Sequence, residues 1–200
     1  MRPSPSAPAT APFDWPRLCQ SLAALGAVLC LYAGECRPQQ GVLRGDAPLP
    51  WQRELLGLLS AARLEPVVSL DSDGPLEGLW FLDDEGRPGF GLCLLPDSDF
   101  LAWERLLAGL PVCRNAVGGW CERLLTRLAR RWRGEDWRAG LRRFRFGVAA
   151  GLPVLALEPV ARISPVSVHA AHRLAQRSHA RFDSHADACC RACGRLGLYH

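Results

Sequence analysis

The chain has 200 residues, of which 48% are hydrophobic and 22% charged, so it carries enough apolar side chains for a folded core. All 24 of its Lys or Arg positions are Arg. Without lysine, the standard Walker A loop, the pyridoxal Schiff base and the kinase strand lysine are excluded. Nine cysteines at irregular spacing disfavour a secreted disulfide scaffold and favour a cytoplasmic protein.

Charge is distributed unevenly along the chain. Residues 46–104 contain 12 acidic residues against 3 Arg, a net charge of −9, whereas residues 105–146 contain 11 Arg against 3 acidic residues, a net charge of +8. Two interpretations stay open: the two parts pack together and neutralise each other, or an acidic face and a basic face bind different partners.

The first third of the chain predicts helices. Residues 1–12 are rich in Pro, Ala and Ser and are expected to be a disordered tail. Residues 15–33 predict a buried helix that Asp14 caps, with an apolar run shorter than the roughly 20 residues of a membrane span. A membrane contact is therefore not expected. A second helix is predicted over residues 51–64.

Residues 66–95 predict the sheet. Three apolar runs are separated by turns rich in Asp, Gly and Pro, which is the pattern of short antiparallel strands. The turn at Asp83-Asp84-Glu85 has two interpretations, a solvated hairpin tip or a cluster of carboxylates for a divalent cation.

The C-terminal half predicts mainly helices. Asp97-Ser98-Asp99 is a capping sequence for a helix over residues 100–110. Further helices are expected over 120–133, from Glu135-Asp136 to about 146, and from Pro165 to about Cys193, with one short strand over 152–157.

These elements predict an α+β fold: a small antiparallel three-stranded sheet over about 66–95 packed by helices, with a helix-rich C-terminal half. The predicted organisation is a tail over 1–12, a single domain over 13–160 and a helical extension over 161–200. The helix–three-strand–helix order is similar to that of bacterial secretion chaperones of the Tir-chaperone type. This topological resemblance implies a protein that binds other proteins.

A second resemblance lies at residues 67–76. The run Val67-Val68-Ser69-Leu70-Asp71-Ser72-Asp73-Gly74 resembles the first motif of the haloacid-dehalogenase-like phosphatases. The resemblance implies that Asp71 is the nucleophile and Asp73 the general acid/base, with both holding Mg²⁺. The same residues also suit a simple turn between two strands.

An arginine-rich block follows, interleaved with aromatic residues. Its side chains suit phosphate and base contacts in nucleic acid, an acidic protein partner, or a merely solvated face. The candidate binding residues are Arg123, Arg127, Arg130, Arg131, Trp132, Arg138 and Arg142.

The C-terminal segment contains the candidate metal ligands. His185, Cys189 and Cys193 follow one another at intervals of four residues on a predicted helix, and such side chains bind Zn²⁺. One helix cannot surround an ion with three successive ligands, so a site would need another segment or chain.

The sequence favours a non-enzymatic intracellular adaptor that binds a protein partner through its charged faces and needs no cofactor. A Mg²⁺-dependent phosphohydrolase and an arginine-rich nucleic-acid-binding regulator are the alternatives. Homo-oligomerisation is left open.

Overall fold

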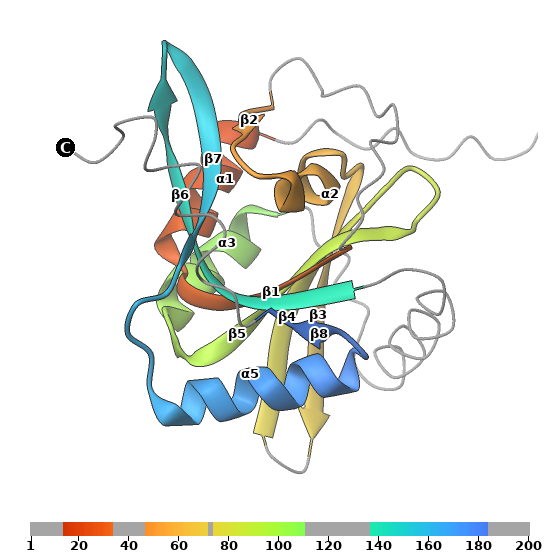
Figure 1. Ribbon diagram of the computed structural model, residues 1–200. Coiled ribbons are helices and arrows are strands. Elements are labelled where there is room, and N and C mark those ends of the chain that lie inside the picture. Colours follow the sequence, from red (N-terminus) through yellow and green to blue (C-terminus); the bar gives the residue numbers. More distant parts are fainter. Residues whose placement is uncertain (1–13, 34–46, 72–73, 111–136, 184–200) are drawn as a thin grey trace, which may run out of the picture.

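The computed structural model describes residues 14–33, 47–71, 74–110 and 137–183, and the fold below refers to these ranges (Figure 1). The helices are α1 Trp15–Ala24, η1 Arg53–Leu55 (a 3-10 helix), α2 Leu56–Leu59, α3 Phe100–Gly109 and α5 Pro165–Arg177. The strands are β1 Gly26–Ala33, β2 Leu49–Pro50, β3 Arg63–Asp71, β4 Gly74–Leu82, β5 Pro88–Ser98, β6 Trp137–Ala149, β7 Leu152–Pro159 and β8 Arg181–Phe182.

All the described strands belong to one eight-stranded sheet with the order β2-β7-β6-β1-β5-β4-β3, and β8 pairs with β6 off this path. The β2–β7 and β6–β8 pairs are parallel and the other pairs are antiparallel. Figure 1 shows the sheet curling around α1, α2 and α3, while α5 crosses the opposite side.

The predicted fold class is therefore wrong. Strands β3, β4 and β5 occupy the predicted three-strand region, but they form only one side of a much larger sheet. The C-terminal half is not helix-rich, because β6 and β7 form a long hairpin where a helix to about residue 146 was expected. The signal was present in the alternation of Arg143, Phe144, Arg145 and Phe146, which has the period of a strand.

The predicted helix over residues 15–33 is also wrong in its second half. Gly26 has a φ of 73°, which takes the chain out of the helical conformation directly after α1. The strand that follows is buried on both faces: Val28 and Cys30 pack on one side, and Leu29 and Leu31 on the other. A run that is apolar at every position carries no periodicity, so the sequence could not distinguish a strand from a helix here.

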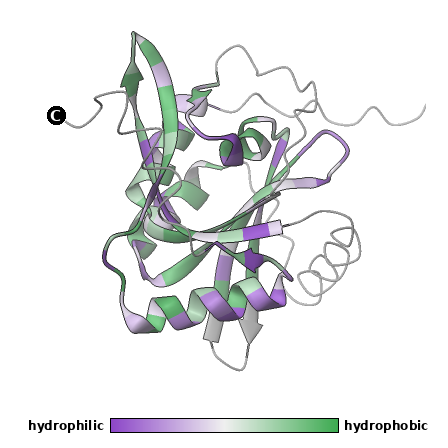
Figure 2. Cartoon of the chain, in the orientation of Figure 1, coloured by the Kyte–Doolittle hydropathy of each residue, from purple (hydrophilic) through white to green (hydrophobic). Residues whose placement is uncertain are grey.

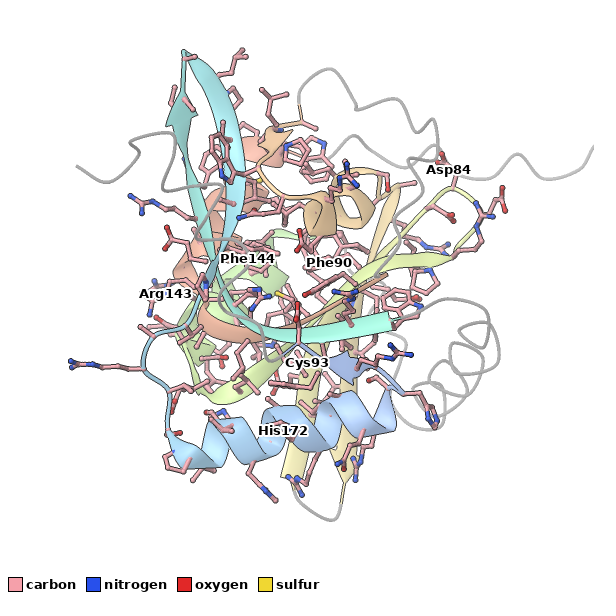
Figure 3. The ribbon with its side chains drawn as sticks, viewed as in Figure 1. Asp84, Phe90, Cys93, Arg143, Phe144 and His172 are labelled. Atoms are coloured by element: carbon pink, nitrogen blue, oxygen red, sulfur yellow. The ribbon has the colours of Figure 1, made fainter. Side chains whose placement is uncertain are left out.

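Two hydrophobic clusters lie on opposite faces of the sheet. The larger one joins α1, α2 and α3 to the strands and includes Phe90 and Phe144, whose ring centroids lie 6.1 Å apart (Figure 3). The smaller one joins α5 to β1, β4 and β5 through residues such as Trp80 and Cys93.

Short polar side chains set the start of two helices. Asp99 caps α3 by accepting a hydrogen bond from the Ala102 amide at 2.8 Å, which confirms the predicted capping sequence. Asp97 accepts a hydrogen bond from the amide of Ser164, the residue before α5, at 2.6 Å.

Helix α5 ends at Arg177 and not near Cys193, because β8 follows it. No helix among the described residues is both long and apolar enough to cross a membrane.

Candidate functional site

The structure places only part of the predicted site residues. Asp73, Arg123, Arg127, Arg130, Arg131, Trp132, His185, Cys189 and Cys193 lie outside the described residues. Asp71 ends β3 and pairs with Gly74 in the antiparallel β3–β4 hairpin, an arrangement that differs from the parallel sheet of the dehalogenase-like family. Arg138 and Arg142 both lie on β6 and belong to the candidate site.

The turn at residues 83–88 forms the predicted hairpin tip. Asp83 Oδ1 accepts hydrogen bonds from the Glu85 and Arg87 amides at 2.9 and 2.8 Å, and Gly86 adopts a φ of 72°. Asp84 points outward at this tip (Figure 3). The Asp83 carboxylate is thus used to shape the turn. Among the described residues, no group of three His, Cys, Asp or Glu side chains could hold a metal ion.

Arg138 and Arg142 lie on the same face of β6 because they are four residues apart on a strand. Gly140 lies between them. A Cβ atom at Gly140 would be only 3.0 Å from Cζ of Arg142, so the absence of a side chain there allows the guanidinium to lie along the strand. Arg181 of β8 is the register partner of Arg138 on the neighbouring strand. We call Arg138, Arg142 and Arg181 the arginine corner.

Arg142 sits where β6 changes partner. Strand β7 pairs with β6 only from Arg142 onward, and β8 pairs with Arg138 and Ala139. Nη1 of Arg142 donates to the Leu141 carbonyl oxygen at 3.2 Å in the stretch between these two partners. Nη2 lies 3.4 Å from the Tyr32 hydroxyl and 3.5 Å from Asp183 Oδ2, so the guanidinium joins β6 to both residues.

Tyr32 supplies a fixed hydrogen-bond donor to the corner. Its side chain is buried, and its hydroxyl donates to Asp183 Oδ2 at 3.0 Å. Burial raises the pKa of the Tyr32 phenol, Arg142 partly opposes this rise, and Asp183 adds to it. The phenol therefore stays protonated at neutral pH and holds Asp183 as an acceptor.

The chemistry of the corner favours binding of an anion. Arg138 and Arg181 stand side by side on adjacent strands, and both side chains are exposed, so an anion in solution can reach them. Guanidinium groups bind carboxylates and phosphates through paired hydrogen bonds. Burial raises the pKa of the Cys30 thiol, and the positive charge of Arg142 opposes this rise only in part. Cys30 therefore does not supply a thiolate at neutral pH.

A hollow of about 50 Å³ opens on the other face of the sheet, between α5 and β4. Trp80, Cys93 and Leu174 are among its lining residues. Pockets for small organic ligands typically measure about 300–1,000 Å³, so this hollow is too small for such a substrate.

Sequence reasoning missed part of the corner. It named Arg138 and Arg142 as candidates but neither Arg181 nor the two residues that contact Arg142, Tyr32 and Asp183. Tyr32 is far from all of these residues in the chain. One signal for Arg181 was available in the sequence. Residues 159–182 contain four Arg and three His but no Asp or Glu, so this segment is basic and could have been added to the arginine-rich block.

Comparison with known proteins adds no assignment. No protein-family model matches the chain, and searches of curated proteins and of solved structures return no match.

Proposed function

We propose that the protein is a non-enzymatic adaptor that binds an acidic segment of a partner protein at the arginine corner. The observation that carries the proposal is the register pairing of Arg138 with Arg181, with Arg142 on the same strand as Arg138. These three arginines outnumber the two carboxylates close to them, Asp183 beside Arg142 and Glu54 within electrostatic range of Tyr32, so positive charge is in excess and a carboxylate-rich segment complements it.

The surroundings of the corner support a protein ligand. Strand β8 has only two residues, so the positive surface lies at a margin of the described sheet that an extended segment can reach. Arg142 is anchored to Tyr32 and Asp183, which restricts its rotamers before a ligand arrives. Such preorganisation lowers the entropy lost on binding. A secretion-chaperone-like role is one form of this proposal.

We place the adaptor in the cytoplasm. Cys19, Cys30 and Cys93 are buried with free thiols, which suits a reducing compartment.

The proposal is tested with matched charge reversals. Arg138→Glu/Arg181→Glu reverses two charges in the corner, and Arg105→Glu/Arg162→Glu reverses two exposed charges elsewhere. Each tagged variant and the wild type are used to capture proteins from the native host, followed by mass spectrometry. The same acidic partner should be recovered by the wild type and the control pair, but not by the corner pair.

Two results would count against the proposal. One is recovery of the partner by the corner variant at the wild-type level, and the other is failure of the wild type to recover any specific protein. The alternative functions give different signals: Mg²⁺-dependent hydrolysis of a phosphate ester that Asp71→Asn abolishes, or nucleic-acid binding that weakens steeply with salt.

A further inference from the structure

The β6–β7 hairpin continues past the end of its neighbour β1. Pairing between β1 and β6 runs from Ala33 opposite Trp137 to Ala27 opposite Arg143. Beyond Arg143, β6 pairs with β7 as far as Ala149 opposite Leu152. Ala150 and Gly151 close the hairpin with φ angles of 51° and 79°, the left-handed pair of a tight two-residue turn. Figure 1 shows this hairpin extending beyond the rest of the sheet.

Among the strands that the structure describes, none lies beside one edge of β6 in this extension. The carbonyl of Ala139 accepts from the Asp183 amide and that of Leu141 from Arg142, so these odd-numbered residues direct their backbone groups toward β7 and β8. Backbone direction alternates along a strand, so Phe146 and Val148 direct their N–H and C=O groups toward the opposite edge. Among the described strands, none pairs with β6 on that edge beyond Arg143.

The side chains near this edge are apolar. From Phe146 to Leu157 there is no charged or hydrogen-bonding side chain. Val148 is 75% exposed and Leu152 is 52% exposed, and Figure 2 shows the hairpin coloured mainly as hydrophobic. Proteins usually protect an exposed strand edge with a charge or a proline, and residues 146–149 contain neither.

We propose that the edge of β6 pairs with the same edge of a second copy of the chain, giving a symmetric dimer with a continuous sheet. The segment is self-complementary: an antiparallel arrangement about Gly147 places Phe146 of each copy opposite Val148 of the other. Arg145 then lies opposite Ala149, so no two arginines face each other. In such a symmetric contact the same edge of each copy is used, so neither copy has this edge left for a third chain and the assembly ends at the dimer.

The backbone directions fit this register. Phe146 and Val148 form hydrogen-bonded pairs across the interface, and Gly147 meets its equivalent in the pair without hydrogen bonds. Nothing lies within 4 Å of the position that a Cβ atom would take at Gly147, so among the described residues the face of the sheet to which this Cβ would point is open.

The first test is the oligomeric state of the full chain, measured by sedimentation velocity across a dilution series. The wild type should sediment as a dimer that dissociates on dilution, and Val148→Lys should be a monomer at every concentration. Leu152→Lys is the matched control, because it adds the same charge to the same hairpin on β7, away from the edge. Circular dichroism verifies that each variant is folded.

The second test uses a disulfide. The Cα atoms of a pair without hydrogen bonds lie about 4.5 Å apart, which falls within the range that a disulfide spans. Gly147→Cys should therefore form a covalent dimer on oxidation that a reductant reverses, above the level of the wild type. Leu152→Cys should not.

Three outcomes overturn the dimer: a wild type that is monomeric throughout, a Val148→Lys variant that remains dimeric, or equal loss of the dimer in Leu152→Lys. A wild-type dimer in which Gly147→Cys fails to cross-link overturns the pairing about Gly147. The dimer goes beyond the proposed adaptor function and fails independently of it, because the arginine corner and the β6 edge are tested with different variants.

Discussion

The Tyr32 hydroxyl donates a hydrogen bond to Asp183 Oδ2 at 3.0 Å and so joins β1 to the residue that follows β8. These two residues are 151 positions apart in the chain. Because Arg142 contacts both, this single contact connects three strands at the arginine corner.

Tyr32→Phe should destabilise the protein, because the substitution removes the donor and leaves Asp183 with one partner fewer. The expected loss is about 1.5–3 kcal/mol in the free energy of unfolding, the range for a hydrogen bond to a charged group. Urea denaturation of the wild type, Tyr32→Phe, Asp183→Asn and the double variant measures it. If the two losses add fully in the double variant, the residues are not coupled and the prediction is wrong.

Asp97→Asn should change how stability depends on pH. Hydrogen bonds from Ser164 hold the pKa of the Asp97 carboxyl below its usual range. A lowered pKa in the folded state contributes stability above the unfolded value of about 3.9, and this contribution disappears as the pH falls through the folded pKa. The wild type should therefore melt at a higher temperature than Asp97→Asn at neutral pH, with a difference that shrinks in acid. A difference that is independent of pH would contradict this assignment.

Gly57→Ala should be strongly destabilising. Gly57 of α2 approaches β5 so closely that an added Cβ would overlap the carbonyl oxygen of Gly89. Backbone cannot rotate away as a side chain can, so a loss of about 1–3 kcal/mol or more is expected. Gly109→Ala is the control, because its nearest contact would be Arg17 Nη2 at 3.5 Å. Equal stability of the two variants in urea would refute the close approach.

The three buried thiols should resist alkylation in the native protein. Burial raises the pKa of Cys19 and of Cys93 to about 12 and also raises that of Cys30, so little reactive thiolate forms at neutral pH. Iodoacetamide labelling followed by peptide mass spectrometry should show slow modification of these residues until urea unfolds the chain. If these thiols were alkylated in native buffer as fast as in urea, they would be accessible and the prediction would be wrong.

Local features of the sequence determined part of the structure. Asp14 and Asp99 cap α1 and α3 as expected, because an N-cap depends on a carboxylate and an amide within the same turn. The turn at Asp83 and Gly86 also formed as expected, because its hydrogen bonds join residues no more than four positions apart. The arginine-rich block contains Arg138 and Arg142, but their role in binding stays a prediction, and the sequence could not say what surrounds them.

Tertiary structure decided the rest. Strand β1 is apolar at every position because helices cover both faces of the sheet around it, and only packing distinguishes such a strand from a buried helix. The arginine corner, and the contact of Arg142 with Tyr32 and Asp183, arise because β8 returns to pair with β6 after α5 has crossed the sheet. Among the described strands, none pairs with β6 on the β1 side at Phe146 and Val148, because pairing with β1 ends at Arg143. Each of these features depends on which strands, far apart in the chain, become neighbours, and such long-range strand pairing has no local signal in the sequence.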